Sequence, residues 1–179
     1  GVSYTHFHFG EDVRIKEKKT AVIDLADDLD TIFARFHDTT RNEIRKTYHM
    51  QDLAIVVEDQ DIATLFVLHK KFERKQSRSP LSFPSFRASI FFSAYYKGEL
   101  IACVACYHDE HSTRVRAIFS TRLFEKDNKD KYRIIAYATR RLIWEACQYG
   151  KRKGNILFAL GALNFSDPAR ASITQFKLK

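Results

Sequence analysis

Phe176 and Lys177 lie side by side near the end of the chain, where an ammonium group against an aromatic ring can act on a carbonyl group. They follow an apolar run over residues 156–160 that ends at Gly161, and a polar turn with Asp167-Pro168. Acyl transfer builds negative charge on the carbonyl oxygen, and a positive group in a water-poor cleft stabilises that charge by about 3 kcal/mol. We predict a catalytic role for the pair; a helix-terminal lysine that complements the helix dipole is the alternative.

A second candidate group lies on a predicted helix, where Arg41 and Arg45 are four residues apart and Asn42 and Lys46 form the adjacent row. Like charges at this spacing repel by about 0.3 kcal/mol, so a partner should offset them. Guanidinium groups grip phosphate oxygens, which predicts an anion-binding, substrate-binding face. A solvated face neutralised by Glu43 or a neighbouring carboxylate is the alternative.

Asn164 and Ser166 lie just after a predicted strand, beside Asp167. Sheets flanked by helices often bind ligands at the carboxyl ends of their strands, so we include both as candidate substrate-binding residues. Turn formation by the first two and helix capping by the aspartate explain the same residues without a ligand.

Metal-ligating patterns are weak in this sequence, and we expect no metal. Cys103 and Cys106 are three apart on a predicted strand, so their side chains face opposite sides and core packing is the favoured interpretation. The two histidine pairs, which lack a carboxylate or thiolate set at ligand spacing, are His6 with His8 and His108 with His111.

Length and composition favour one domain with a sizeable core, because the chain has 179 residues of which 45% are apolar. The 30 Lys and Arg residues against 22 Asp and Glu give a formal net charge of +8, which favours an anionic substrate or partner. No apolar stretch approaches the roughly 20 residues that span a membrane, and no signal peptide is evident. Three cysteines suit a reducing compartment, so we expect a cytoplasmic protein with no membrane span.

The elements that must position these side chains are a series of short strands and amphipathic helices. Apolar alternation predicts strands over residues 20–25, 53–57, 89–96, 100–107, 114–123 and 155–160. Apolar residues at helical spacing predict helices from Asp28 to about Tyr48, over 63–72, over 131–153 and from Asp167-Pro168 onward, with a loop over 77–87. The order predicts an α/β fold (an α+β arrangement) with a central mixed, mostly antiparallel sheet and helices on both faces.

Three segments resemble the GNAT acyltransferase fold, and within it the FemAB-like group related to peptidoglycan aminoacyltransferases. They are the arginine-bearing segment Thr39–Lys46, the stretch from Leu142 to Gly154 with the strand after it, and Phe176-Lys177. The resemblance covers about residues 39–179. It implies one GNAT-like domain over residues 1–179 that lacks the last C-terminal strands of the family, and it implies that Phe176 and Lys177 lie at the aminoacyl donor end.

One departure concerns the donor. Ordinary GNAT enzymes hold the coenzyme A pyrophosphate in a glycine-rich turn, whereas residues 124–131 of this chain contain no glycine. FemAB-like members also lack that turn, which favours them over acetyl-CoA enzymes.

The sequence therefore predicts an N-acyltransferase that moves an acyl or aminoacyl group to an amine of a phosphate-bearing or cell-wall-type acceptor. The donor, aminoacyl-tRNA or acyl-CoA, would be a cosubstrate and not a permanently bound cofactor. The first alternative is a GNAT N-acetyltransferase that depends on acyl-CoA or an acyl carrier. The second is a non-catalytic RNA- or nucleotide-binding module on a GNAT scaffold. The partner is then an anionic small molecule or a tRNA-linked substrate.

Overall fold

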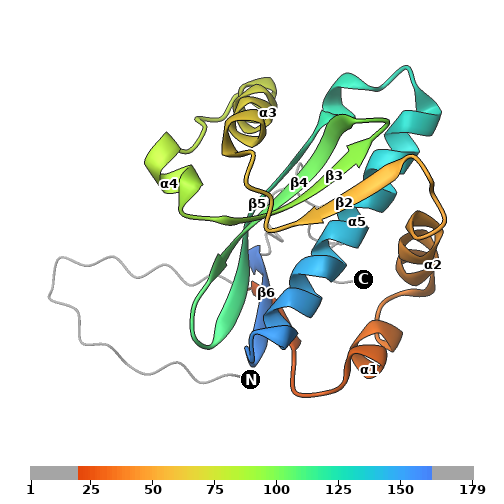
Figure 1. Cartoon of the computed structure of the whole chain (residues 1–179), viewed down its shortest axis with the longest axis vertical. Coiled ribbons are helices and arrows are strands. Elements are labelled where there is room, and N and C mark those ends of the chain that lie inside the picture. Colours follow the sequence, from red (N-terminus) through yellow and green to blue (C-terminus); the bar gives the residue numbers. More distant parts are fainter. Residues whose placement is uncertain (1–19, 163–179) are drawn as a thin grey trace, which may run out of the picture.

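The computed structural model describes residues 20–162 of the chain. In this part, six strands form one sheet in the order β1-β6-β5-β4-β3-β2, with helices on both faces (Figure 1). The strands are β1 (Thr20–Asp24), β2 (Leu53–Val57), β3 (Ile90–Tyr96), β4 (Glu99–His108), β5 (Ser112–Ser120) and β6 (Leu157–Ala162). The helices are α1 (Leu29–Ala34), α2 (Asp38–Thr47), α3 (Ile62–Lys75), α4 (Phe83–Arg87) and α5 (Lys129–Arg152), with a 3₁₀ turn η1 (Thr121–Phe124) before α5.

An antiparallel meander of β2 to β5 forms the larger part of the sheet. The β3–β4 turn places Lys97 at φ 51° and Gly98 at φ 80°, which suits the tight two-residue turn of a hairpin. β6 then adds parallel to β5 and antiparallel to β1. The expected mixed, mostly antiparallel sheet is confirmed.

The two faces of the sheet each carry an apolar cluster. One cluster lies under α1, α2 and α5 and includes Phe92 and Cys106, and the other lies under α3 and α4 and includes Phe91 and Cys103. The two cysteines therefore point to opposite faces and are fully buried, as their spacing predicts.

Helix α5 is the longest element and follows its sequence pattern closely. The apolar residues whose helical spacing predicts this helix are all buried: Ile135, Ala138, Leu142, Ala146 and Tyr149. Full burial of one such large aliphatic side chain stabilises the fold by about 2 kcal/mol. Asn128 caps the first turn, and Gly154 follows the helix at φ 80°, the left-handed conformation that glycine adopts without strain.

The prediction of a single helix from Asp28 to about Tyr48 is wrong, because two helices, α1 and α2, occupy this segment. Asp28 does cap α1, since its Oδ1 accepts from Thr31 N at 2.8 Å. The helix ends at Ala34, and His37 caps a new helix by accepting from Thr39 N at 3.3 Å. Tyr48, at the end of the predicted helix, is the C-cap of α2 and is 54% exposed.

Two further boundaries differ from the sequence prediction. The loop predicted over 77–87 contains α4, which buries Phe86 between α3 and the sheet. The last strand starts at Leu157, and Asn155 lies before it as a buried polar residue.

Candidate functional site

The parallel neighbours β5 and β6 separate soon after they start. They pair over Ser112–Arg114 and Leu157–Ala159, while β5 continues to Ser120. None of the other described strands pairs with the remainder of β5 on that side. The sheet is therefore continuous at one end of these strands and divided at the other.

A β-bulge on β5 coincides with the point of separation. Cys106 lies opposite Val115 and Ala105 lies opposite Ala117, so Arg116 is the extra residue. A bulge bends its strand and increases the local twist, which explains why β5 turns away from β6 here. The Arg116 guanidinium is held by α4, where it donates to the carbonyl and hydroxyl oxygens of Ser85.

The free edge beyond the bulge offers backbone groups to a ligand. Alternate N–H and C=O groups of residues 115–120 face the side where β6 has separated, and none of the described strands pairs with them there. Such an edge can bind an extended ligand by main-chain hydrogen bonds. Its N–H groups are also suitable donors to a carbonyl oxygen that becomes negative during acyl transfer.

The start of α5 comes soon after this edge along the chain. Two carboxylates that are paired with Lys131 lie near it, Glu99 of β4 and Glu125 before the helix. Asn128 Oδ1 accepts from Lys131 N at 3.0 Å, and Lys131 Nζ lies 2.8 Å from both Glu125 Oε1 and Glu99 Oε2. Hydrogen bonds to Glu125 and then to Glu99 raise the pKa of Lys131, while Lys131 lowers the pKa of Glu99. A pyrophosphate at this helix start would meet a capped backbone and two carboxylates.

Arg41 on α2 serves the fold. Its guanidinium donates to the carbonyl oxygen of Ala34 and pairs with Asp38, which ties α2 to the end of α1. The pair with Asp38 agrees with the neutralised face that the sequence left open as an alternative, and substrate binding by Arg41 stays a prediction.

Arg45 and Lys46, the next cations of α2, are exposed and make no ion pair with any residue of 20–162. Arg45 lies over the Phe33 ring at 5.5 Å and within 3.5 Å of Asn42 Oδ1, and Lys46 Nζ lies 5.8 Å from the Tyr137 ring. Both cations are therefore available to an anion, and binding by them, with Asn42 beside them, stays a prediction.

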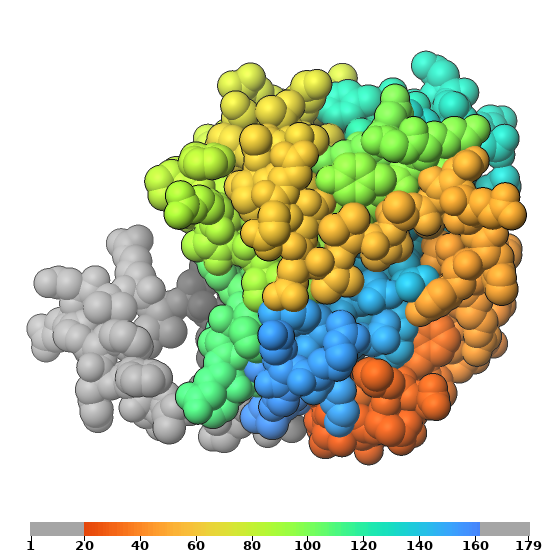
Figure 2. Space-filling model, viewed as in Figure 1, coloured from red at the N-terminus to blue at the C-terminus, as the bar shows by residue number. Residues whose placement is uncertain are grey.

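A polar stripe on α5 continues from α2. Arg141 pairs with Glu145 at 2.6 Å, lies 3.4 Å from the Thr47 hydroxyl and stacks on Tyr48 at 3.3 Å from the ring centroid. Tyr149 follows at the same four-residue spacing, so all three α5 side chains share one side of the helix. In Figure 2, the C-terminal part of α5 reaches the surface between β2, the β4–β5 hairpin and helices α1 and α2.

From the sequence alone, Arg141 and Glu145 are no more than part of the polar side of the amphipathic helix predicted over 131–153. The contacts of Arg141 with Thr47 and Tyr48 span nearly a hundred residues and have no local signal. Four predicted site residues, Asn164, Ser166, Phe176 and Lys177, lie outside the described residues, so their convergence with α2 stays a prediction.

Among residues 20–162, no three His, Cys, Asp or Glu side chains are grouped to hold a metal ion. None of the helices in this range is long and apolar enough to cross a bilayer.

Comparison of the whole fold with solved structures identifies GNAT-like proteins. FemX superposes with a TM-score of 0.70 at 9% identity, covering 88% of this chain and 57% of that one. L-PGS from Bacillus licheniformis gives 0.56 at 14% identity, covering 89% and 51%. The C-terminal domain of a proposed lysylphosphatidylglycerol synthetase from Agrobacterium fabrum gives 0.59 at 13% identity, covering 82% and 47%.

The fold is therefore GNAT-like, and the FemAB-like form of it expected from the sequence is confirmed at the level of the fold. No protein-family model and no curated protein sequence matches the chain. The chain spans about half the length of the solved structures that it matches. Whether residues 1–179 form one domain stays a prediction.

Proposed function

We propose that the protein is an N-acyltransferase that moves an acyl or aminoacyl group to an amine of a phosphate-bearing or cell-wall-type acceptor. The observation that supports this most directly is the GNAT-like sheet with its parallel strands separated at a bulge beside Arg116. The free β5 edge offers N–H groups to the reacting carbonyl, and no metal is needed for this chemistry.

Arg45 and Lys46 are the proposed anchors of the acceptor. Both cations are exposed; Arg45 lies over the Phe33 ring of α1, and Lys46 lies beside the Tyr137 ring of α5. Phosphate oxygens accept from guanidinium and ammonium groups in charge-assisted hydrogen bonds, which orient the acceptor along α5.

The start of α5 favours an aminoacyl ester over acetyl-CoA as the donor. A helix start with backbone N–H groups free attracts a pyrophosphate, but Asn128 caps this one, and Glu99 and Glu125 flank it. This supports aminoacyl-tRNA as cosubstrate, with the acyl-CoA-dependent enzyme as the alternative.

A mass screen tests the proposal. The full chain is incubated with acetyl-CoA, palmitoyl-CoA and alanyl-tRNA, together with a lysine-containing nucleotide-linked peptidoglycan precursor and phosphatidylethanolamine as acceptors. Alanylation of one acceptor, read as intact mass, is expected. Transfer from coenzyme A esters alone would replace the proposed donor, and no transfer in any combination would exclude the enzyme.

Lys177→Ala is expected to lower turnover about 100-fold or more while the melting temperature stays unchanged, because the ammonium would act only on the developing charge. Lys179→Ala, which removes a neighbouring lysine of the same type, is the matched control and should retain full activity. Equal rates for both variants would remove Lys177 from the mechanism.

A second candidate function, RNA or nucleotide binding without catalysis, is favoured by a group of cations on α3. Lys71, Arg74 and Lys75 are exposed and make no ion pair within the described part of the chain. The salt dependence of RNA binding tests it.

A further inference from the structure

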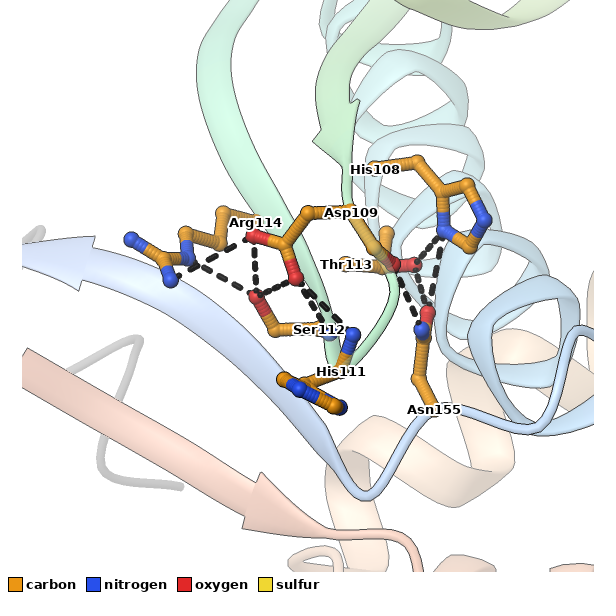
Figure 3. Close-up of polar contacts among 7 residues, drawn as sticks. All are labelled: His108, Asp109, His111, Ser112, Thr113, Arg114 and Asn155. Carbon is orange, nitrogen blue, oxygen red and sulfur yellow. Dashed lines mark hydrogen bonds and ion pairs between the residues drawn. The ribbon is translucent and has the colours of Figure 1, made fainter.

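The two ends of β5 differ in what they leave accessible to a ligand. At its start, polar side chains bond to one another, as Thr113 Oγ1 does when it donates to Asn155 Oδ1 at 2.7 Å (Figure 3). At its end, β5 has separated from β6 and continues from Ser120 into η1. Arg122 lies in η1, and its side chain makes no hydrogen bond or ion pair with any of residues 20–162.

The Arg122 guanidinium stacks on the ring of Tyr132, in the first turn of α5. Its Cζ lies 4.0 Å from the ring centroid. Both side chains are exposed, Tyr132 to 37%. A guanidinium over a ring presents its outer planar face and its N–H donors to solvent. The pair therefore offers a flat surface to a planar ligand.

The carboxylates of this region do not neutralise Arg122. Glu125, three residues later, pairs with Lys131 at 2.8 Å. Asp130 pairs with Arg133 at 2.8 Å. A pyrophosphate would approach these carboxylates, whereas a nucleobase is uncharged and stacks on aromatic rings and on guanidinium planes.

Tyr132 lies on the side of α5 that faces β5 and β6. Gly150 is eighteen residues later, which is about five full turns, so the two residues have the same orientation on the helix. A Cβ at Gly150 would lie 3.0 Å from Thr113 Oγ1, and Thr113 of β5 pairs with Phe158 of β6. At the start of α5, the same side of the helix faces the part of β5 from which β6 has separated.

The pair also lies next to the free edge of β5. Arg122 is two residues after Ser120, the last residue of that edge, and its backbone N–H donates to the Ser120 hydroxyl at 3.4 Å. Lys131 pairs with Glu99 of β4, which holds the start of α5 at the end of the sheet where Ala102 lies opposite Ser120. Figure 1 shows η1 and the start of α5 at this end, away from the paired part of β6.

We propose that Arg122 and Tyr132 form a stacking platform for the terminal base of a tRNA donor, an inference that deepens the proposed function and rests on it. In an aminoacyl-tRNA, the amino acid is esterified to the ribose of the terminal adenosine, so the base and the reacting carbonyl are attached to one sugar. A base on Arg122 therefore places its ester beside the last residues of β5, whose N–H groups are the proposed donors to the carbonyl oxygen. The platform binds the donor and takes no part in the bond changes.

Coenzyme A also carries an adenosine, but its base is joined to a pyrophosphate. Beside this platform, the pyrophosphate would meet the capped start of α5 and the carboxylates of Glu99 and Glu125. The terminal adenosine of a tRNA carries a single phosphodiester on the same side of its ribose. The charges around the platform therefore favour the end of a tRNA.

Binding of a short RNA to the full chain tests the platform without catalysis. The probe is a labelled single-stranded RNA that ends in CCA, compared with the same RNA lacking its terminal base. Loss of the base should weaken binding to the wild type about tenfold, because stacking on an aromatic side chain contributes about that factor. Tyr132→Ala should bind both RNAs equally, with an unchanged slope of affinity against salt, since no phosphate contact is lost.

Conservative variants separate stacking from charge. Tyr132→Phe keeps the ring and should keep the preference for the terminal base. Arg122→Lys keeps the charge but not the planar face and should lose most of the preference. Arg133→Gln removes a neighbouring exposed cation that is paired to Asp130, so it is the matched control and should behave as the wild type.

Kinetics with the acceptor that the mass screen identifies test the same platform in the working enzyme. Tyr132→Ala should raise KM for alanyl-tRNA about tenfold with little change in kcat, because the ring binds the donor away from the reacting atoms. A loss of kcat with KM unchanged would contradict a binding role and overturn the inference.

The outcomes distinguish this inference from the proposed function. An active enzyme that binds both RNAs equally, or a Tyr132→Ala variant that keeps the preference, overturns the inference and leaves the proposed function intact. Displacement of the RNA by coenzyme A would assign the platform to a coenzyme A donor and overturn the inference. A protein that prefers the terminal base but transfers no acyl group keeps the platform as an RNA site and overturns the proposed function.

Discussion

His69, on α3, is an imidazole buried among aromatic rings. It is 2% exposed, and its centroid lies 5.0 Å from that of Phe86 and 5.2 Å from that of Phe119. Its Nε2 accepts from Leu81 N at 3.1 Å, which ties the start of the α4 segment to α3. Burial lowers the pKa of His69, the Glu73 charge opposes this shift, and the charges of Arg116 and Arg78 add to it.

This burial predicts a loss of stability in acid. Because the folded-state pKa lies below the unfolded value of about 6.5, the unfolded chain binds the proton first, and unfolding becomes easier as the pH falls through that value. One such group changes the free energy of unfolding by at most about 1.4 kcal/mol per pH unit. Urea unfolding at pH 7 and pH 5 should show a smaller acid loss for His69→Gln, which can still accept from Leu81 N. Equal losses in both proteins would contradict a neutral His69.

At the residue scale, local roles were predictable and distant partnerships were not. Asp28 as a helix cap and the burial of Cys103 and Cys106 follow from patterns a few residues long. Arg41 was expected to meet either a carboxylate or a ligand; it pairs with Asp38, and its hydrogen bond to the carbonyl oxygen of Ala34 depends on where the first helix ends. The pairing of His108 with Asn155 joins residues 47 apart, which no local pattern can reveal.

At the element scale, α5 was predictable because its apolar spacing is regular from Ile135 to Tyr149, about four turns, and both ends carry capping residues. The break between α1 and α2 was missed because Phe36 keeps the apolar spacing through the break. Its ring packs against Trp144 at 5.6 Å and is half-buried although it lies outside both helices. Helix α4 was missed because a five-residue helix is too short to show a period.

Close packing of α5 on the sheet gives a prediction at this scale. A Cβ at Gly150 would lie 3.0 Å from Thr113 Oγ1 and 3.2 Å from Thr113 Cβ. Thr113 cannot easily move, since it is fully buried in β5 and bonded to Asn155. Alanine favours a helix by about 1 kcal/mol over glycine, but the overpacking should exceed this and destabilise Gly150→Ala by a net of about 1 kcal/mol.

Denaturant unfolding measures the effect of Gly150→Ala, with Gln148→Ala on the same helix as the control for helix propensity. A variant as stable as the wild type would show that α5 and β5 can separate slightly at no cost. The contacts of Thr113 with His108 and Asn155 would then be less rigid than their distances indicate.

At the scale of the whole molecule, the sheet and its helical layers were predictable, and the strand order was not. Alternating β3, β4 and β5 imply a meander, because adjacent antiparallel strands need only short turns. The insertion of β6 between β1 and β5 depends on pairing across 45 residues with β5, where Ser112 meets Leu157, and across more than a hundred residues with β1, where Asp24 meets Leu157. The separation of β5 and β6 depends on a bulge that leaves no trace in the alternation of apolar residues.

The net charge of +8 belongs to the whole molecule, but its distribution decides whether RNA binds at one surface. On α3, Lys71 and Lys75 make no ion pair within residues 20–162, and the nearby Glu73 is already paired with Arg78 at 2.7 Å. Neutralising one phosphate contact lowers the slope of log K against log salt by about 0.7 for a single strand, so Lys71→Gln with Lys75→Gln should lower it by about 1.4.

The control double variant, Arg35→Gln with Arg133→Gln, removes the same charge from cations that are paired to Asp27 and Asp130. Titration of a labelled single-stranded RNA between 50 and 200 mM salt should give different slopes for the two variants. The number of counterions released depends on the local phosphate contacts and not on the total charge of the protein. If both variants change the slope equally, the cations of α3 form no particular RNA surface, and the binding reflects the positive charge of the whole protein.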